Sequence, residues 1–395
     1  MAGLSFPDMH LSEVEQAGLV SLLQRLIQFP TEDPPGREVE LACFVHDTLK
    51  DSGLASNLIE FQPGRANVVA RLPGQGERPG LVFSAHLDTL PLGEGSWCFP
   101  PFEGRVSDGR VYGRGASDMK GGLAAMIAAA QKLARQDPPL KGDLILAFSA
   151  GESSNGLGAK EMVADGSLEG AGALLVSEPT TLEIVVAEKG ALWVKAMAAG
   201  TTGHPSGAGG SCGTGDNAIL KLVDFINRLQ GFEFGASSHP LLGEPTLTVT
   251  TIRGGSAINL TPDHAEVGLD IRYLPGMASE TILGGLQAVA DATDSQVALE
   301  TLDDKPAIET RADHPFVRLC RDSYRSSLGV ESPLRGASYF SDSAVLCPAL
   351  GLPRAIVGPG EMGMSGQRDE YVSIERLVAA ADLYAQIAVD FLLLA

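Results

Sequence analysis

Four short apolar segments alternate with helical patterns along this chain, and this alternation limits the folds available to it. Each segment has the length of a strand and lacks a polar face, as expected of a strand covered on both sides. Strands that alternate with helices predict an α/β fold with a mostly parallel sheet flanked by helices. The four segments span residues 80–84, 142–149, 171–177 and 353–358.

Acidic residues and a histidine follow three of these predicted strands. His86 and Asp88 lie two positions apart, so in an extended chain their side chains point to the same side. Glu152 and Glu178 follow the next two strands. Because ligands bind at the carboxyl ends of parallel strands, a histidine and several carboxylates at this edge are typical of a metal site. For each position alone, the alternative is a polar strand end beside a turn.

Asp118 has two interpretations, because it lies just ahead of a helical pattern at residues 123–136. Aspartate in this place is commonly an N-cap that accepts backbone hydrogen bonds. It is otherwise a further candidate for the metal site. Other helical patterns occupy residues 14–29, 38–52, 314–328 and the C-terminal part from about residue 373.

The pattern changes between residues 189 and 305, where strand-like runs are mixed with two helical runs. We therefore expect an inserted α+β domain at 189–305, with 1–188 and 306–395 forming the metal-binding domain. A boundary between two domains is a common place for a small-molecule site.

Charge and cysteine content narrow the functional classes. The formal net charge of -20 argues against nucleic acid or an anionic membrane as a partner. No stretch reads as a signal peptide or a membrane span, so a cytoplasmic location is expected. The cysteines are odd in number and lack paired spacing, which suits a reducing compartment and excludes a cysteine-type zinc motif. They are Cys43, Cys98, Cys212, Cys320 and Cys347.

Short motifs occur in a characteristic order over nearly the whole chain. They are DPPGRE at 33–38, HLD at 86–88, GRGASDMKGG at 113–122, SEPT at 177–180, KG at 189–190, GTTGH at 200–204, GGSAIN at 254–259, DIR at 270–272 and GPG at 358–360. In this order the chain resembles the zinc exopeptidase and deacylase family of acetylornithine deacetylase, succinyl-diaminopimelate desuccinylase, aminoacylase and glutamate carboxypeptidase. The resemblance implies a zinc-exopeptidase-like fold with an inserted lid or dimerisation domain.

The resemblance also implies roles for the strand-end residues. His86 and Glu178 would be ligands of a first zinc, and Asp118 would bridge two metals. Asp88 would orient His86. Glu152 would be the general base that takes a proton from a metal-activated water. The expected activity is hydrolysis of an N-acyl amino acid or a small peptide-like amide.

Three residues of the inserted domain receive roles in the same way. His204 would stabilise the oxyanion, in the family often across a homodimer, while Asn259 and Arg272 would bind a carboxylate of the substrate. The alternatives are a loop histidine for His204 and a surface ion pair for Arg272.

Two positions depart from the family pattern, and both concern the second metal. Ser153 follows Glu152 where the family has a second acidic residue, and Gly366 stands where it has a histidine. We therefore expect one Zn2+ per chain, with Co2+ or Mn2+ as alternatives, unless Glu361 or Asp369 rebuilds the second site. The double loss also leaves open a relative repurposed for a non-hydrolytic or amide-forming step, or a non-catalytic binding protein.

Overall fold

The computed structural model describes residues 9–204, 216–235, 238–293 and 296–394, so Cys212 lies outside the described residues. The chain divides into two compact units. The first comprises Met1–Val186, Glu309–Arg335 and Ser341–Ala395, and the second comprises Ala187–Ile308 and Gly336–Phe340. None of the helices in the described ranges is long and apolar enough to cross a membrane.

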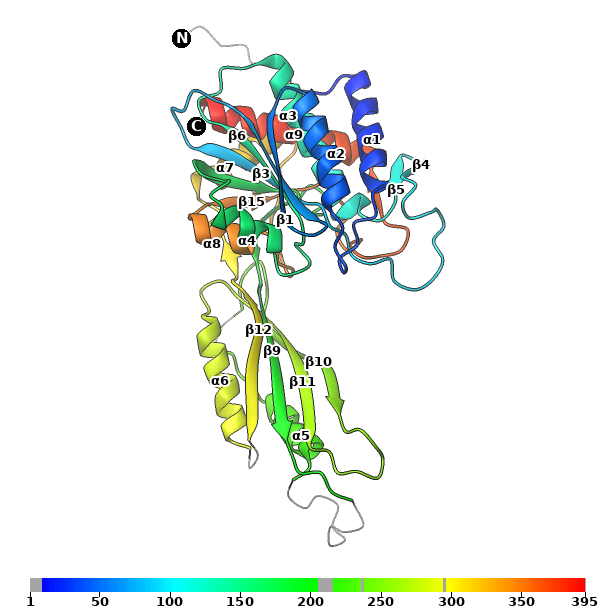
Figure 1. Ribbon diagram of the computed structural model, residues 1–395. Helices are drawn as coiled ribbons and strands as arrows, with labels where there is room; N and C mark the ends of the chain where they lie inside the picture. Colours follow the sequence, from blue (N-terminus) through cyan, green and yellow to red (C-terminus); the bar gives the residue numbers. More distant parts are fainter. Residues whose placement is uncertain (1–8, 205–215, 236–237, 294–295, 395) are drawn as a thin grey trace. The chain divides into compact units, whose positions relative to one another are not determined.

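The larger sheet has nine strands in the described part of the chain, and its centre is parallel (Figure 1). Strand β3 pairs in parallel with β6 and β7, and β7 pairs in parallel with β15. The outer strands β1 and β2 are antiparallel, as is β8 beside β15. The α/β class is confirmed, while the sheet is mixed because only four central strands are parallel. Its strands are β1 (Ala55–Gln62), β2 (Arg65–Leu72), β3 (Gly80–His86), β6 (Leu144–Ser149), β7 (Ala171–Val176), β8 (Ile184–Glu188), β13 (Ile308–Glu309), β14 (Leu334–Ala337) and β15 (Arg354–Ile356).

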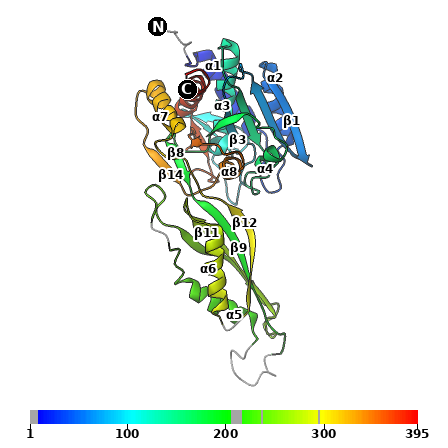
Figure 2. The ribbon, with the colours of Figure 1, turned by 90° about the vertical axis from the view of Figure 1, so that its left-hand side faces the viewer.

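Helices cover this sheet, and the central strands show why they must. Every residue of β3 and β6 is buried, so neither face of these strands meets solvent. Helix α3 packs against α1 and α9, α9 packs against α7, and α4 packs against α8 (Figure 2). The helices are α1 (Glu13–Ile27), α2 (Val39–Asp51), α3 (Gly121–Gln136), α4 (Leu157–Ala164), α7 (Pro315–Leu328), α8 (Ser343–Leu350) and α9 (Ile374–Val389).

A small three-stranded sheet frames the segment that carries Asp118. Strand β5 (Arg110–Tyr112) lies between β4 (Arg105–Ser107) and β16 (Tyr371–Ser373). The chain after β5 passes through the short π-helical segment η1 (Ala116–Lys120), which carries Asp118, into α3, whose cap residue is Lys120. The N-cap interpretation of Asp118 is therefore wrong, because Asp118 lies two residues before the cap and its carboxylate contacts His86 and Ser365.

The second unit is a four-stranded antiparallel sheet with two helices. The strand order is β10-β11-β9-β12, and burial alternates along β11, as expected when one face is covered. The covered face packs on the apolar sides of both helices through Leu222, Phe225 and Leu286. Edge strand β10 is exposed along most of its length. The elements are β9 (Gly190–Ala199), α5 (Ala218–Leu229), β10 (Thr246–Gly254), β11 (His264–Tyr273), α6 (Ser279–Asp291) and β12 (Val297–Lys305).

Candidate metal centre

Three side chains from separate segments converge at the carboxyl edge of the central strands. His86 is the last residue of β3, Asp118 lies in the turn before α3, and Glu178 follows β7. The His86 Nε2 atom lies 3.0 Å from Asp118 Oδ1 and 3.7 Å from Glu178 Oε1. Each of the three offers a ligand atom, and these atoms lie within 4.8 Å of one another. Within the described ranges, no other group of His, Cys, Asp and Glu side chains meets this condition.

The orientation of His86 is fixed from its other ring nitrogen. Nδ1 lies 2.9 Å from the backbone carbonyl oxygen of Asp88, whereas the Asp88 carboxylate is 3.8 Å away. A carbonyl only accepts, so Nδ1 carries a hydrogen, and Nε2, which faces the two carboxylates, is the nitrogen that can hold a proton or a metal cation. Asp88 therefore orients the imidazole chiefly through its main chain, a detail that the sequence does not reveal.

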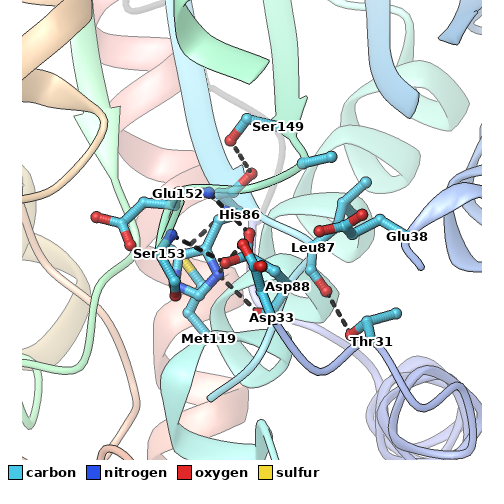
Figure 3. A network of polar contacts seen from close by, with 12 residues as sticks. Thr31, Asp33, Glu38, His86, Leu87, Asp88, Met119, Ser149, Glu152 and Ser153 are labelled. Carbon is cyan, nitrogen blue, oxygen red and sulfur yellow. Dashed lines mark hydrogen bonds and ion pairs between the residues drawn. The ribbon is translucent and has the colours of Figure 1, made fainter. Parts of the chain in front are cut away.

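The Asp88 carboxylate instead holds the turn that carries Glu152. Its two oxygens accept hydrogen bonds from the backbone N–H groups of Glu152 and Ser153, each at 3.0 Å. Figure 3 shows both nitrogens near Asp88, while the Glu152 side chain extends to the side away from Asp33 and Glu38. One residue thus couples the histidine to the proposed base.

The electrostatics of the cluster favour a cation at Nε2. Burial alone would lower the pKa of His86, but the negative charges of Asp88, Asp118 and Glu178 raise it well above its ordinary value. Burial also disfavours the charged form of Asp118 and would raise its pKa, but the hydrogen bonds with His86 and Ser365 hold this pKa below its usual range. Carboxylates that stabilise a proton on Nε2 will also stabilise a metal cation there.

Glu152 differs from the proposed ligand Asp118, because its surroundings disfavour its charge. It is buried, and burial raises its pKa well above the ordinary value, with further contributions from Asp342, Asp88 and Asp118. His86 acts in the opposite direction. A buried carboxyl group with a raised pKa beside a cation site is typical of a residue that takes up and releases a proton.

Glu370 supports the segment that carries Asp118, a role that the sequence does not indicate. Its Oε1 accepts hydrogen bonds from the N–H groups of Ser117 and Asp118, both at 2.9 Å. Its Oε2 accepts from Arg114 at 2.7 Å and from the N–H of Gly115 at 3.1 Å. Burial and the charge of Asp118 raise the pKa of Glu370 to about 7. The residue fixes the loop of a proposed ligand from more than 250 positions away along the chain, a contact that no local spacing signals.

The two positions that break the family pattern have definite surroundings. Ser153 is partly buried, and its N–H is committed to Asp88. Gly366 has a φ of +70°, and a Cβ atom there would lie 2.9 Å from the side chain of Leu90. The hydroxyl of the preceding Ser365 donates a hydrogen bond to Asp118 Oδ2. The sequence pattern did not indicate this contact of Ser365 either.

The two acidic residues that could replace the missing ligands of a second metal make contacts with other groups. Glu361 is paired with Arg376, and Asp369 accepts a hydrogen bond from the N–H of Cys98 at 2.6 Å. Neither belongs to the metal-binding group found among the described residues.

The candidate residues of the inserted domain lie in the second unit. His204 follows β9 and is exposed, and Asn259 is exposed in a turn between β10 and β11. Arg272, on β11, donates two hydrogen bonds to Asp270, at 2.7 and 3.0 Å. The ion pair weighed as an alternative for Arg272 is therefore present.

Comparison with known proteins places this geometry in a family. A model of peptidase family M20/M25/M40 matches residues 82–390. The chain belongs to this family. It is 26% identical to a probable succinyl-diaminopimelate desuccinylase of Staphylococcus aureus (strain MRSA252), over 94% of this chain and 97% of that protein. It is 29% identical to the acetylornithine deacetylase of Vibrio campbellii, over 87% of this chain and 89% of that protein.

Solved structures show the same fold. The metallo-carboxypeptidase Sso-CP2 of Sulfolobus solfataricus superposes with a TM-score of 0.78 at 19% identity, covering 96% of this chain and 99% of that one. The YXEP protein of Bacillus subtilis, described as a dinuclear metal-binding peptidase, gives a TM-score of 0.74 at 17% identity, with the same coverage. Family membership makes the chain a metal-dependent amidohydrolase, and the non-hydrolytic and binding-only alternatives are not favoured.

A substitution of Glu370 tests how strongly its hydrogen bonds hold the site together. We expect Glu370→Gln to weaken metal affinity roughly 10- to 100-fold, as for other residues that orient metal ligands. The reason is that a neutral amide holds Arg114 and the Asp118 loop less firmly than a carboxylate does. Competition with a chelating dye measures the affinity, and Glu375→Gln, which changes an exposed acid on α9, is the control. An unchanged affinity in Glu370→Gln would show that Glu370 does not support the metal site.

Proposed function

We propose that this chain hydrolyses an N-acyl amino acid or a small peptide-like amide at the centre formed by His86, Asp118 and Glu178, with Glu152 as the general base. The observation that carries the proposal is the Asp88 bridge, which fixes His86 with its carbonyl and the Glu152 turn with its carboxylate. The names of the curated relatives, a desuccinylase and a deacetylase, support acylated amino acids as the substrate class.

The donor set fits zinc. One imidazole nitrogen and two carboxylate oxygens are common zinc ligands, and three protein ligands with one open position form a catalytic arrangement. A bound zinc ion would lower the pKa of water and polarise the scissile carbonyl, and its charge would lower the pKa of Glu152. Mn2+ and Co2+ are the alternatives.

The protein groups around this centre have separate tasks. Glu152 accepts a proton as the nucleophile forms and returns it to the leaving nitrogen, which requires one carboxyl group to serve as base and then as acid. Asp88 keeps the turn of Glu152 in place through both of its oxygens. On the second unit, His204 is proposed to stabilise the oxyanion, and Asn259 and Arg272 to bind the substrate carboxylate. Arg272 would then bind its anion while paired with Asp270.

We further propose that the centre holds a single metal ion. Asp118 turns one oxygen to His86, and its other oxygen accepts a hydrogen bond from Ser365. A hydroxyl group that donates to this oxygen can stabilise its negative charge without a second cation. A histidine at position 366 would have to adopt the left-handed backbone conformation of Gly366, which is strained for residues other than glycine. Its Cβ atom would also lie too close to the side chain of Leu90.

A homodimer is proposed from the exposed edge of the second unit. Strand β10 has one side without a strand partner in the described residues, and it exposes Val249 and Ile252, the latter at 58%. An unprotected edge with apolar side chains is suited to pair with another strand. The family resemblance supports a second copy of this chain as the partner. A cytoplasmic location remains a prediction.

The role of Glu152 is tested by its isosteric amide. Glu152→Gln should lower kcat for an N-acyl amino acid by about 100- to 10,000-fold, because the amide cannot accept the proton. Its bound zinc should match that of the wild type, since Glu152 is not a proposed ligand. Glu161→Gln, at an exposed site on α4, is the control and should retain full activity. Unchanged turnover in Glu152→Gln would contradict the mechanism.

The dimer is tested by sedimentation at several protein concentrations. The wild type should sediment at twice the chain mass of 41.2 kDa, and Ile252→Lys should sediment as the monomer, because a lysine on the paired edge opposes strand addition. Val330→Lys changes a similarly exposed apolar residue of the first unit, at 57%, and should leave the mass of the dimer unchanged. A wild type that stays monomeric throughout would exclude this interface.

A further inference from the structure

A buried arginine lies directly behind the turn that carries Glu152. Arg65 is the first residue of β2, and its side chain is 9% exposed. Its guanidinium donates to both oxygens of Asp33, at 2.7 and 3.1 Å, and to Glu38 Oε1 at 3.1 Å. A two-pronged contact of this kind fixes the plane of the guanidinium as well as its position.

Two glycines make room for this guanidinium between two loops. A Cβ atom on Gly151, in the turn that carries Glu152, would lie 2.4 Å from Arg65 Nη1. A Cβ atom on Gly36, in the loop of Asp33, would lie 2.2 Å from Arg65 Cζ. Both glycines also have positive φ, at +72° and +77°. The guanidinium therefore touches the backbone of both loops, and it also donates to the hydroxyl of Ser154 at 3.4 Å.

The loop of Asp33 is in turn tied to the strand end that carries His86. The Thr31 hydroxyl donates to the carbonyl of Leu87 at 2.7 Å, and the N–H of Thr89 donates to the carbonyl of Thr31 at 2.8 Å. The N–H of Asp33 donates to the carbonyl of Thr89, also at 2.8 Å. Asp88 lies between these tied residues, and Figure 3 shows Thr31, Asp33 and Leu87 gathered beside it.

We propose that Arg65 is a positioning residue for catalysis, which holds the turn 151–154, and with it Glu152, at a fixed place relative to His86. These contacts connect the strand end through Asp33 and Arg65 to Gly151 and Ser154, in addition to the hydrogen bonds that Asp88 makes to the same turn. The proposal rests on the proposed role of Glu152 as the base.

Energetics favour positioning over simple stabilisation. A buried ion pair adds little net stability compared with apolar side chains of similar volume, because both charges lose their hydration. What it supplies is a defined geometry, and arginine supplies more of it than lysine because its planar fork reaches several acceptors at once. The neighbouring Ser154 and Gly151 are the groups that this geometry reaches on the side of Glu152.

The test uses the full chain and the variants Arg65→Lys and Ser154→Ala. Lysine keeps a positive charge beside Asp33 and Glu38 but loses the fork, and alanine removes only the contact with the turn. The matched control is Arg71→Lys, on the same strand, where Arg71 pairs with Asp143 at 3.2 Å at a partly exposed site. Hydrogen exchange followed by mass spectrometry with electron-transfer fragmentation reports on individual amides within the peptides covering residues 149–157 and 82–89.

The amides of Glu152 and Ser153 should exchange about ten-fold faster in Arg65→Lys and about three-fold faster in Ser154→Ala, because lysine gives up the whole fork and alanine a single hydroxyl. Peptide 82–89 and the control variant should match the wild type. With an N-acyl amino acid as substrate, kcat of Arg65→Lys should fall about 100-fold while KM stays within about two-fold, because a small displacement of a catalytic group costs this much.

Wild-type exchange at residues 152–153 in both Arg65→Lys and Ser154→Ala would overturn the proposal, whatever happens to the melting temperature. So would wild-type kcat in a folded Arg65→Lys. If Arg65→Lys does not fold, exchange in Ser154→Ala decides alone. The exchange measurement does not depend on turnover. Absence of hydrolysis by the wild type would therefore count against the proposed function, while faster exchange in the variants would still support the hold on the turn.

Discussion

The structure depends on one constraint, which is the close approach of one imidazole and two carboxylates at the edge of the sheet. His86, Asp118 and Glu178 come from three separate segments, and their ligand atoms lie within 4.8 Å of one another. Two carboxylates at this separation repel each other, and burial makes that repulsion stronger because the effective dielectric constant is lower. A cation between them removes the conflict. The raised pKa of His86 shows that the surroundings favour positive charge at this point.

Much of the remaining architecture serves to keep these groups in place. The parallel order of the central strands brings His86 and the segments of Glu152 and Glu178 to one edge. Asp88 ties the first two together, and Glu370 secures the turn of Asp118 with bonds to three backbone N–H groups. These are contacts to main-chain atoms, and they hold the short segments that follow the strands of the sheet. The site thus depends on a rigid sheet edge and on buried acids that immobilise the loops above it.

The parts visible in the sequence were those encoded by local patterns. Apolar runs predicted the central strands and placed His86, Glu152 and Glu178 at their ends, and the family resemblance assigned metal-ligand roles to Asp118 and Glu178. Contacts between distant positions were not predictable in this way. Glu370 and Ser365 reach the Asp118 segment from the far end of the chain, and the main-chain role of Asp88 depends on the path of the backbone after β3. The outer strands are antiparallel because β1 and β2 are joined by a tight turn and β8 runs against β15, and apolar runs alone do not indicate the direction of a strand.

The central claim is a single metal ion bound by His86, Asp118 and Glu178. The most direct test is the metal content per chain, measured by elemental analysis after dialysis against zinc and removal of free ions. One equivalent in the wild type and none in His86→Ala, with His46→Ala unchanged, is the predicted result. Two equivalents in the wild type would contradict the single-metal centre, and full zinc content in His86→Ala would contradict the ligand assignment itself.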